Sequence, residues 1–341
     1  MQAAMRVYRS IKQIYDWGKE AGRAGHLSKP YGDVATLTST PDQYLFALTG
    51  LYWFYKLPDC PVQDEIEQIF IDCAEFCMNR DYQVCYLSSW NMISEVGAYN
   101  AIYMLIPFLA YLVTNQERYL EEMNRVAQLG HWRTESYLGP WAREGLERML
   151  MFERVCLAHF ALSPAEIFAR EYPRIFGVTP DEQQRTLAHL SEEWWKFGAL
   201  GIDEDDYSNY WVDIDVRNAT WRSTGLTPLQ PKAEGSENEF NGDYFFIRYY
   251  SDVKFPPPLY RQIHNSLILY NHATDSQRQT EAKAMFLRLL HKTDGNRLRW
   301  MIDLDGQQLL PEIKYHCCIL DSEAPFHYLY MYWRGVEQGL I

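Results

Sequence analysis

The sequence lacks the short motifs that mark several common enzyme classes. It contains no Gly-rich phosphate loop, no G-x-S-x-G nucleophile motif and no H-E-x-x-H zinc motif. None of its 7 cysteines has C-x-x-C spacing, and we expect reduced, mostly buried thiols, which suit a reducing compartment. We expect neither a metal nor a cofactor.

An excess of positive charge is also lacking. The net charge is −13, and the Lys and Arg residues form no cluster longer than a pair. Nucleic acids and anionic membrane surfaces bind basic patches, so we expect neither as a partner. A neutral substrate is favoured. An anionic substrate would need a local pocket of arginines, which the overall charge does not exclude.

The only apolar run long enough to cross a bilayer is residues 96–113. It contains polar Tyr99 and Asn100 as well as Pro107, and shorter apolar segments occur elsewhere, so a buried helix is the preferred interpretation. Residues 1–20 are amphipathic with charges throughout, unlike a signal peptide. We expect a cytoplasmic protein; a periplasmic or secreted one is the alternative if the N-terminus has been trimmed.

Aromatic residues are abundant, at 15% of the chain, with 25 Tyr and 11 Trp. Tyr and Trp combine a flat apolar face with a polar group, which suits sugars and other amphipathic ligands. The alternative is that a large helical core packs with aromatic side chains.

Helical patterns dominate, and apolar helices alternate with amphipathic ones. Such alternation is typical of two concentric layers, because inner helices contact protein on all sides and outer helices keep a solvent-facing side. Asp42 or Thr40 can cap the second helix, with Pro41 in its first turn, and Pro61 opens the third. The helices expected in the first half span residues 3–22, 42–56, 93–114, 116–129 and 140–161, and one more starts at Pro61 and includes Ile66 to Cys77.

The second half is less regular. Residues 199–258 are predicted to be an irregular insertion, and residues 297–313 a small β-hairpin around the Asp-Gly turn at 305–306. Further helices are expected over 164–172, 180–197, 259–273, 276–293 and 324–338. We expect a single all-α domain over 1–341, which could be part of a longer protein.

Three segments carry a resemblance to a known family: STPDQYLFALTGLYWFY within 31–55, SSWN followed by AYNAIYMLIPFLAYL, and SEAPFHYLYMYWRGVEQGLI. With these, the chain resembles uncharacterised bacterial members of the (α/α)6-toroid, six-hairpin glycosidase-like superfamily. The resemblance implies alternating inner and outer antiparallel helices and a site at the mouth, where the loops before the inner helices converge. It also implies a carbohydrate-active enzyme, with a saccharide as the substrate.

Glycoside hydrolysis needs two carboxyl groups, one acting as an acid and one as a base or nucleophile. The loops expected at the mouth offer four candidate catalytic residues: Asp33, Asp42, Glu95 and Glu135. The candidate substrate-binding residues are Tyr31, Trp90, Asn91, His131, Trp132, Tyr137, Trp141, His316, Glu323 and His327.

Each candidate has an alternative interpretation. Asp42 precedes a helix and could be a cap, and Asp33 follows a glycine and could be a turn residue. A polysaccharide lyase would use a base such as His131 or Tyr137, and a non-catalytic toroid would bind a glycan or another protein. The acidic residues at 203–206 and 213–215 match no calcium-loop spacing and are expected to be a solvated loop.

Overall fold

The computed structural model describes residues 1–29, 38–86, 89–92, 97–129, 148–186, 188, 208–209, 211–215, 220–223, 253–255, 259–273, 275–292, 302–303 and 324–341. Helices make up most of these residues, as the sequence predicts. The chain divides into two compact units. The first contains 1–137 and 163–172, and the second contains 138–162 and 173–341.

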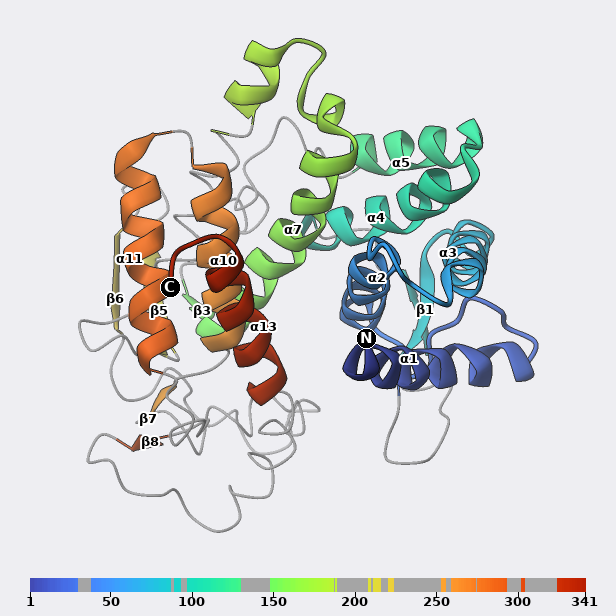
Figure 1. Ribbon diagram of the computed structural model, residues 1–341, viewed down its shortest axis with the longest axis horizontal. Helices are drawn as coiled ribbons and strands as arrows, with labels where there is room; N and C mark the ends of the chain where they lie inside the picture. Colours follow the sequence, from blue (N-terminus) through green and yellow to red (C-terminus); the bar gives the residue numbers. More distant parts are fainter. Residues whose placement is uncertain are drawn as a thin grey trace, which may run out of the picture. The chain divides into compact units, whose positions relative to one another are not determined.

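The first unit is a set of packed helices (Figure 1). Its elements are α1 (Gln2–Glu20), α2 (Pro41–Tyr55), α3 (Gln63–Met78), the antiparallel hairpin of β1 (Gln83–Tyr86) and β2 (Ser89–Met92), α4 (Gly97–Thr114), α5 (Glu117–Leu129) and the C-terminal part of α7 (Met151–Glu171). Pro41 is at the start of α2, as predicted, whereas Pro61 lies in the turn before α3.

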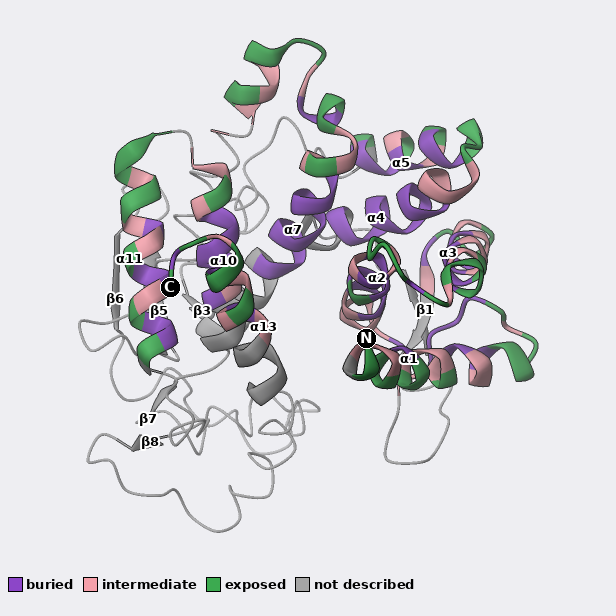
Figure 2. Cartoon of the chain, viewed as in Figure 1, coloured by how far each residue is buried: buried purple, intermediate pink, exposed green. Residues whose placement is uncertain are grey.

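Buried and amphipathic helices alternate along this unit, which confirms the predicted pattern. Every residue of α4 from 101 to 110 is buried, and α2 is mostly buried with a partly exposed face at Gln43, Phe46 and Gly50, whereas α1, α3 and α5 each keep a broader exposed face (Figure 2). In α3 the predicted apolar stripe from Ile66 to Cys77 is buried, and in α5 the stripe from Tyr119 to Ala127 is buried. A helix with an apolar stripe packs that side against protein and leaves its other side exposed to solvent.

Two contacts join the apolar helices α2 and α4 to the C-terminal part of α7. Near the C-terminal end of α2, the Tyr52 hydroxyl donates to Glu171 Oε1 at 2.6 Å, close to the end of α7. In the second half of α4, the Phe108 ring packs edge-on against Phe168 of α7, with 5.2 Å between ring centroids. The C-terminal halves of α2 and α4 therefore both contact α7.

The second unit combines helices with short strands. Its elements are the N-terminal part of α7, β3 (Arg148–Leu150), η1 (Pro173–Phe176), β4 (Ser208–Asn209), β5 (Trp211–Asp215), β6 (Thr220–Ser223), β7 (Val253–Phe255), α10 (Leu259–His272), α11 (Ser276–Lys292), β8 (Ile302–Asp303) and α13 (Ala324–Glu337). The strands form two antiparallel sheets, in the orders β3-β5-β6 and β4-β7-β8. Ile263, Leu267, Phe286, Leu289 and Met331 are central to its core.

Several boundaries differ from those predicted. Strand β3 precedes α7, which begins at Met151 rather than near Pro140 and continues through Pro164, so 164–172 is not a separate helix. Within 297–313, the described strand β8 pairs with β7, some 50 residues upstream. The Asp-Gly turn lies outside the described residues. Strand pairing across such a distance leaves no local signature in the sequence.

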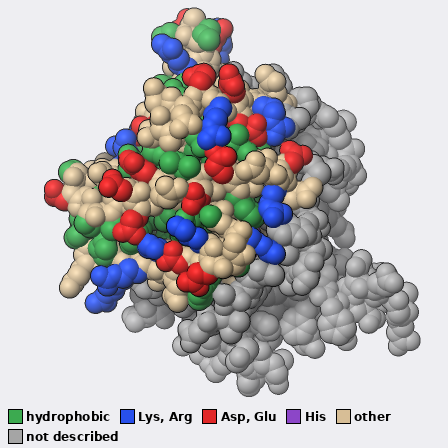
Figure 3. All heavy atoms as spheres, turned by 90° about the vertical axis from the view of Figure 1, so that its right-hand side faces the viewer, with side chains coloured by type: hydrophobic (Ala, Val, Ile, Leu, Met, Phe, Trp, Pro, Cys, Tyr) green, Lys and Arg blue, Asp and Glu red, His purple; other side chains and the backbone are tan. Residues whose placement is uncertain are grey.

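In the described parts of the chain, no helix combines the length and the apolar character needed to cross a bilayer. The apolar run at 96–113 forms α4, whose buried residues contact protein instead. The cysteines described, Cys60, Cys73 and Cys77, are free thiols and are buried. Acidic and basic side chains are interspersed over the face seen in Figure 3.

Candidate functional site

Of the fourteen residues predicted for the site, the structure describes the side chain of Asp42 alone. Trp90 and Asn91 are placed on β2 and His327 on α13 by their backbone. The remaining predicted residues lie outside the described ranges: Tyr31, Asp33, Glu95, His131, Trp132, Glu135, Tyr137, Trp141, His316 and Glu323.

Asp42 lies in the first turn of α2 but does not cap it. The residue at the cap position is Thr40, and no side chain makes a capping hydrogen bond there. The helix begins through its backbone instead, because the Gln43 N–H donates to the Thr40 carbonyl at 3.1 Å. Asp42 is partly exposed. The capping role considered for Asp42 is therefore wrong, although a carboxylate in a first turn still interacts favourably with the helix dipole.

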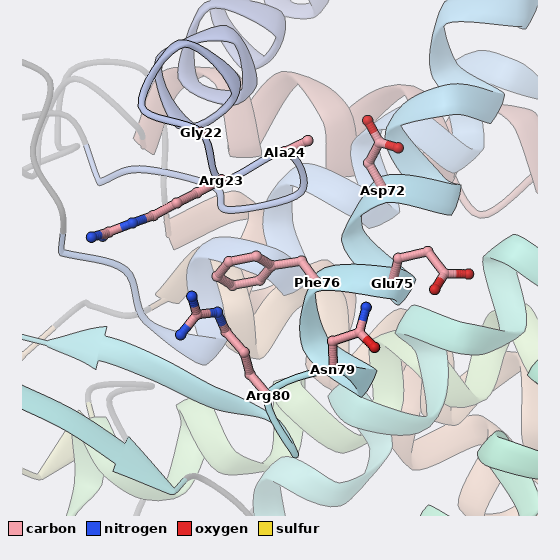
Figure 4. Close-up of a pocket in the computed structure, with 8 residues that line it drawn as sticks. All are labelled: Gly22, Arg23, Ala24, Asp72, Glu75, Phe76, Asn79 and Arg80. Carbon is pink, nitrogen blue, oxygen red and sulfur yellow. The ribbon is translucent and has the colours of Figure 1, made fainter.

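A pocket of about 240 Å³ opens between α3 and the loop that follows α1 (Figure 4). In the chain, the loop follows α1, and α3 precedes the β1–β2 hairpin. Its lining residues are Gly22, Arg23, Ala24, Asp72, Glu75, Phe76, Asn79 and Arg80.

The two carboxylates of the pocket are engaged by neighbours on α1, α3 and α5. Asp72 accepts hydrogen bonds from the Tyr15 hydroxyl and, at 2.7 Å, from Gln68 Nε2. Glu75 accepts one from the Tyr119 hydroxyl at 2.6 Å and forms an ion pair with an arginine of α5. Their negative charge is thus stabilised on the side of the pocket that faces these helices.

The two arginines of the pocket lie near a buried histidine. Arg80 places its guanidinium over the Phe76 ring, with 5.0 Å from Cζ to the centroid, and His26 meets the same ring edge-on at 5.4 Å. His26 is completely buried, and its Nε2 has no hydrogen-bond partner among the described residues. Burial, followed by the charges of Arg23 and Arg80, lowers the pKa of His26 to about 4 from its ordinary 6.5. His26 is therefore neutral at pH 7.

The loop that carries Arg23 is held firmly against α3 and α2. Gly25 has a φ of +87°, and a Cβ there would be 2.0 Å from the Asp72 carbonyl oxygen, so only glycine fits. The Tyr44 hydroxyl donates to the Gly25 carbonyl at 3.0 Å, and Ser39 Oγ donates to the Leu27 carbonyl at 2.6 Å. These contacts fix the backbone on both sides of the segment that leads into α2.

The second unit contains a buried polar cluster that sequence reasoning missed. His159 of α7 places Nδ1 3.3 Å from Asn265 Oδ1 of α10, and its ring lies 4.9 Å from that of His264. The His264 ring in turn meets Tyr330 of α13 edge-on at 5.5 Å. An amide oxygen only accepts, so His159 Nδ1 is the donor in this contact. The signal in the sequence was His159 between apolar Ala158 and Phe160, together with the polar pair His264 and Asn265 beside the apolar run 267–269.

Among the residues whose placement is described, no cluster of three or more His, Cys, Asp or Glu side chains could hold a metal ion. Asp213 and Asp215 belong to β5, where their backbone pairs with β6, and 203–206 lie outside the described ranges. No family model, curated protein or solved structure matches this chain. What these features define is a mostly helical protein in which mostly buried helices alternate with amphipathic ones in the first unit.

Proposed function

We propose that this chain is a carbohydrate-active enzyme, a glycoside hydrolase built on an (α/α)6 toroid. One observation supports the proposal: α4 is buried along residues 101–110 and most residues of α2 are buried, whereas α1, α3 and α5 each keep an exposed face. A toroid requires this arrangement of its inner helices, and amphipathic α1, α3 and α5 fit its outer layer. The resemblance noted for the same segments supports the assignment.

The proposed chemistry uses two carboxyl groups on opposite sides of the scissile bond. Asp33 and Asp42 belong to the segment entering α2, Glu95 to the segment entering α4, and Glu135 to the one that precedes α7. Asp42 has gained support as a candidate, since no cap hydrogen bond occupies it. A separation of about 5–5.5 Å between the two groups predicts retention of configuration, and about 6.5–9.5 Å predicts inversion.

The proposed substrate is a saccharide that stacks on aromatic side chains. Trp90 and Asn91 lie on the hairpin between α3 and α4, which places them in a segment leading to the proposed mouth. Tyr31, Trp132, Tyr137 and Trp141 belong to the segments entering α2 and α7. We further propose a cytoplasmic location and no nucleic-acid partner, on the basis of the acidic charge and the reduced thiols.

The test is a hydrolysis screen over a glycan library, followed by Asp33→Asn and Asp42→Asn on any substrate found. Removing a catalytic acid or base should lower kcat by about 10²–10⁴-fold. Asp64→Asn is the matched control, because Asp64 is also in a first turn but on the outer helix α3. Full activity in both site variants would refute the residue assignment.

The same screen separates the alternatives. An unsaturated product would identify a polysaccharide lyase. Saturable glycan binding without turnover would identify a non-catalytic binding toroid. If the chain neither binds nor cleaves any glycan, the carbohydrate assignment itself is wrong.

A further inference from the structure

We infer that the loop after α1, residues 21–29, is an acid-sensitive switch: it stays packed between α1 and α3 while His26 is neutral, and it opens when His26 is protonated. We call this segment the His26 loop. The inference does not rest on the proposed hydrolase. It concerns described residues of the first unit, and none of the residues proposed for catalysis takes part.

The first argument is the way in which His26 is enclosed. Its side chain is 0% exposed, and its ring meets Phe76 of α3 edge-on, with 5.4 Å between ring centroids. Its backbone is equally close to α1, since a Cβ at Gly18 would lie 2.1 Å from the His26 carbonyl oxygen. The loop therefore fits tightly between α1 and α3, and the imidazole reaches water only when the loop moves.

The second argument is that this site suits a neutral imidazole better than an imidazolium. His26 Nδ1 lies 3.4 Å from the Ser28 hydroxyl, which either donates or accepts, whereas Nε2 has no hydrogen-bond partner among the described residues. A protonated ring would carry a second N–H donor without an acceptor, together with a full positive charge. Burying either one costs free energy, so protonation favours a loop that has moved into water.

The charged neighbours of His26 act in the same direction. Burial is the largest cause that lowers the pKa of His26 to about 4, and the positive charges of Arg23 in the loop and Arg80 after α3 lower it further. The carboxylates of Asp72 and Glu75 lie across the pocket from these arginines (Figure 4). The positive groups are thus the ones that act on the ring.

The other titratable groups beside the loop stay neutral as the pH falls. On α2 the Tyr44 hydroxyl donates to the Gly25 carbonyl at 3.0 Å, and the thiols of Cys73 and Cys77 on α3 lie next to that hydroxyl. Burial raises the pKa of all three groups, to about 12 for Cys77. None of the three therefore changes its charge between pH 7 and pH 5.

The third argument is that the loop is joined to α2 by contacts that break without unfolding a helix. The Leu27 N–H donates to the Tyr44 hydroxyl at 3.4 Å, and Ser39 Oγ donates to the Leu27 carbonyl at 2.6 Å. The Lys29 N–H donates to the Thr38 carbonyl at 2.7 Å. Segments held by a few such bonds open locally, at a lower free energy than the whole domain. Because two of these bonds lead to the residues before α2, an open loop also releases the chain that enters α2.

The test measures hydrogen exchange of backbone amides by NMR on the full chain, at pH 7.5 and pH 5. The amides of Leu27 and Lys29 report on the loop, and those of Leu105 and Phe108 report on buried helix α4. We expect the loop amides to be less protected than those of α4, with little dependence on urea. An open loop returns His26 to water, where its pKa is 6.5, so loop protection, corrected for intrinsic exchange, should fall about 30-fold between the two pH values.

The decisive variant is His26→Gln, and His291→Gln is its control. Glutamine is neutral at both pH values, so the variant should lose the 30-fold fall in loop protection. His291 is exposed on α11 in the second unit, so replacing it removes a histidine without touching the loop and should leave the fall unchanged. An NMR titration of wild-type His26 needs no variant and should give a pKa near 4.

Three results would overturn the inference. The first is loop amides with the same protection and urea dependence as those of α4, because the loop would then open only when the whole unit unfolds. The second is a fall in protection that persists in His26→Gln or disappears in His291→Gln. The third is a wild-type His26 that titrates near 6.5, its ordinary value in water.

Discussion

Protonation of His26 should make the stability of the first unit depend on pH in a defined window. The side chain is completely buried, and its pKa is lowered to about 4, first by burial and then by Arg23 and Arg80. An unfolded chain returns His26 to water, where its pKa is about 6.5. Between these values the unfolded state binds the extra proton, so stability is fully present above pH 6.5 and falls as the pH is lowered towards 4.

The size of this effect follows from the two pKa values. Each unit of difference corresponds to about 1.4 kcal/mol, so the full loss approaches about 3 kcal/mol, of which about 2 kcal/mol is already lost at pH 5. This is a large fraction of the roughly 5–15 kcal/mol by which a typical domain is stabilised against unfolding. Carboxylates also titrate near pH 4, so the signature is the additional slope between pH 5 and 6.5.

The assay compares urea unfolding of wild type and His26→Gln from pH 5 to 7.5. The variant will have its own cost at neutral pH, because glutamine replaces a ring packed on Phe76. The decisive quantity is the difference in free energy of unfolding between wild type and His26→Gln. This difference should decrease by about 2 kcal/mol from pH 7 to pH 5. Parallel curves, or an NMR titration that places the pKa of His26 near 6.5, would refute the reasoning.

Three packing predictions can be checked by the same unfolding measurements. Gly25→Ala should lower the free energy of unfolding by at least about 3 kcal/mol, because φ at Gly25 is +87° and the new Cβ would lie 2.0 Å from a backbone oxygen. Gly22→Ala should cost only about 1–2 kcal/mol, because Gly22 has a similar φ of +72° but nothing lies within 4 Å of the new Cβ. Tyr52→Phe removes the 2.6 Å hydrogen bond to Glu171 and should cost about 1.5–3 kcal/mol. Phe108→Ala leaves a cavity at a side chain with 0% exposure and should cost about 3–5 kcal/mol. Equal costs for the two glycine variants, or losses below about 0.5 kcal/mol for the other two, would contradict the packing described.

The helices of the first unit were predictable because their patterns are local. The stripe of Ile66, Ile69, Phe70, Cys73 and Cys77 repeats at helical spacing, and all five side chains are buried in α3. The apolar run of α4 likewise marks a helix surrounded by protein. A period of 3.6 residues is a property of neighbouring positions, so sequence alone suffices to find it.

Features that join distant segments could not be predicted in this way. The pairing of β7 with β8 and the insertion of β3 before α7 depend on partners far along the chain. The pocket also depends on residues far apart in the chain. Arg23 and Arg80 line it together only because the loop at Gly25 packs against α3. No local pattern around Arg23 or Arg80 marks either residue as part of a pocket.

The start of α2 offers a final test of what its polar residues do. Thr40 Oγ1 is buried and has no hydrogen-bond partner among the described residues, whereas neighbouring Ser39 donates to the Leu27 carbonyl at 2.6 Å. If Thr40 were a cap, Thr40→Val would cost about 1 kcal/mol. Because no such bond forms, we expect the substitution to be neutral or stabilising in urea unfolding, while Ser39→Ala should cost about 1 kcal/mol or more. A destabilised Thr40→Val would restore a structural role to this hydroxyl. A neutral Thr40→Val would mean that α2 does not need the Thr40 hydroxyl or the Asp42 carboxylate to begin. Both groups would then be polar side chains without a role in the helix, at the position of the proposed substrate site.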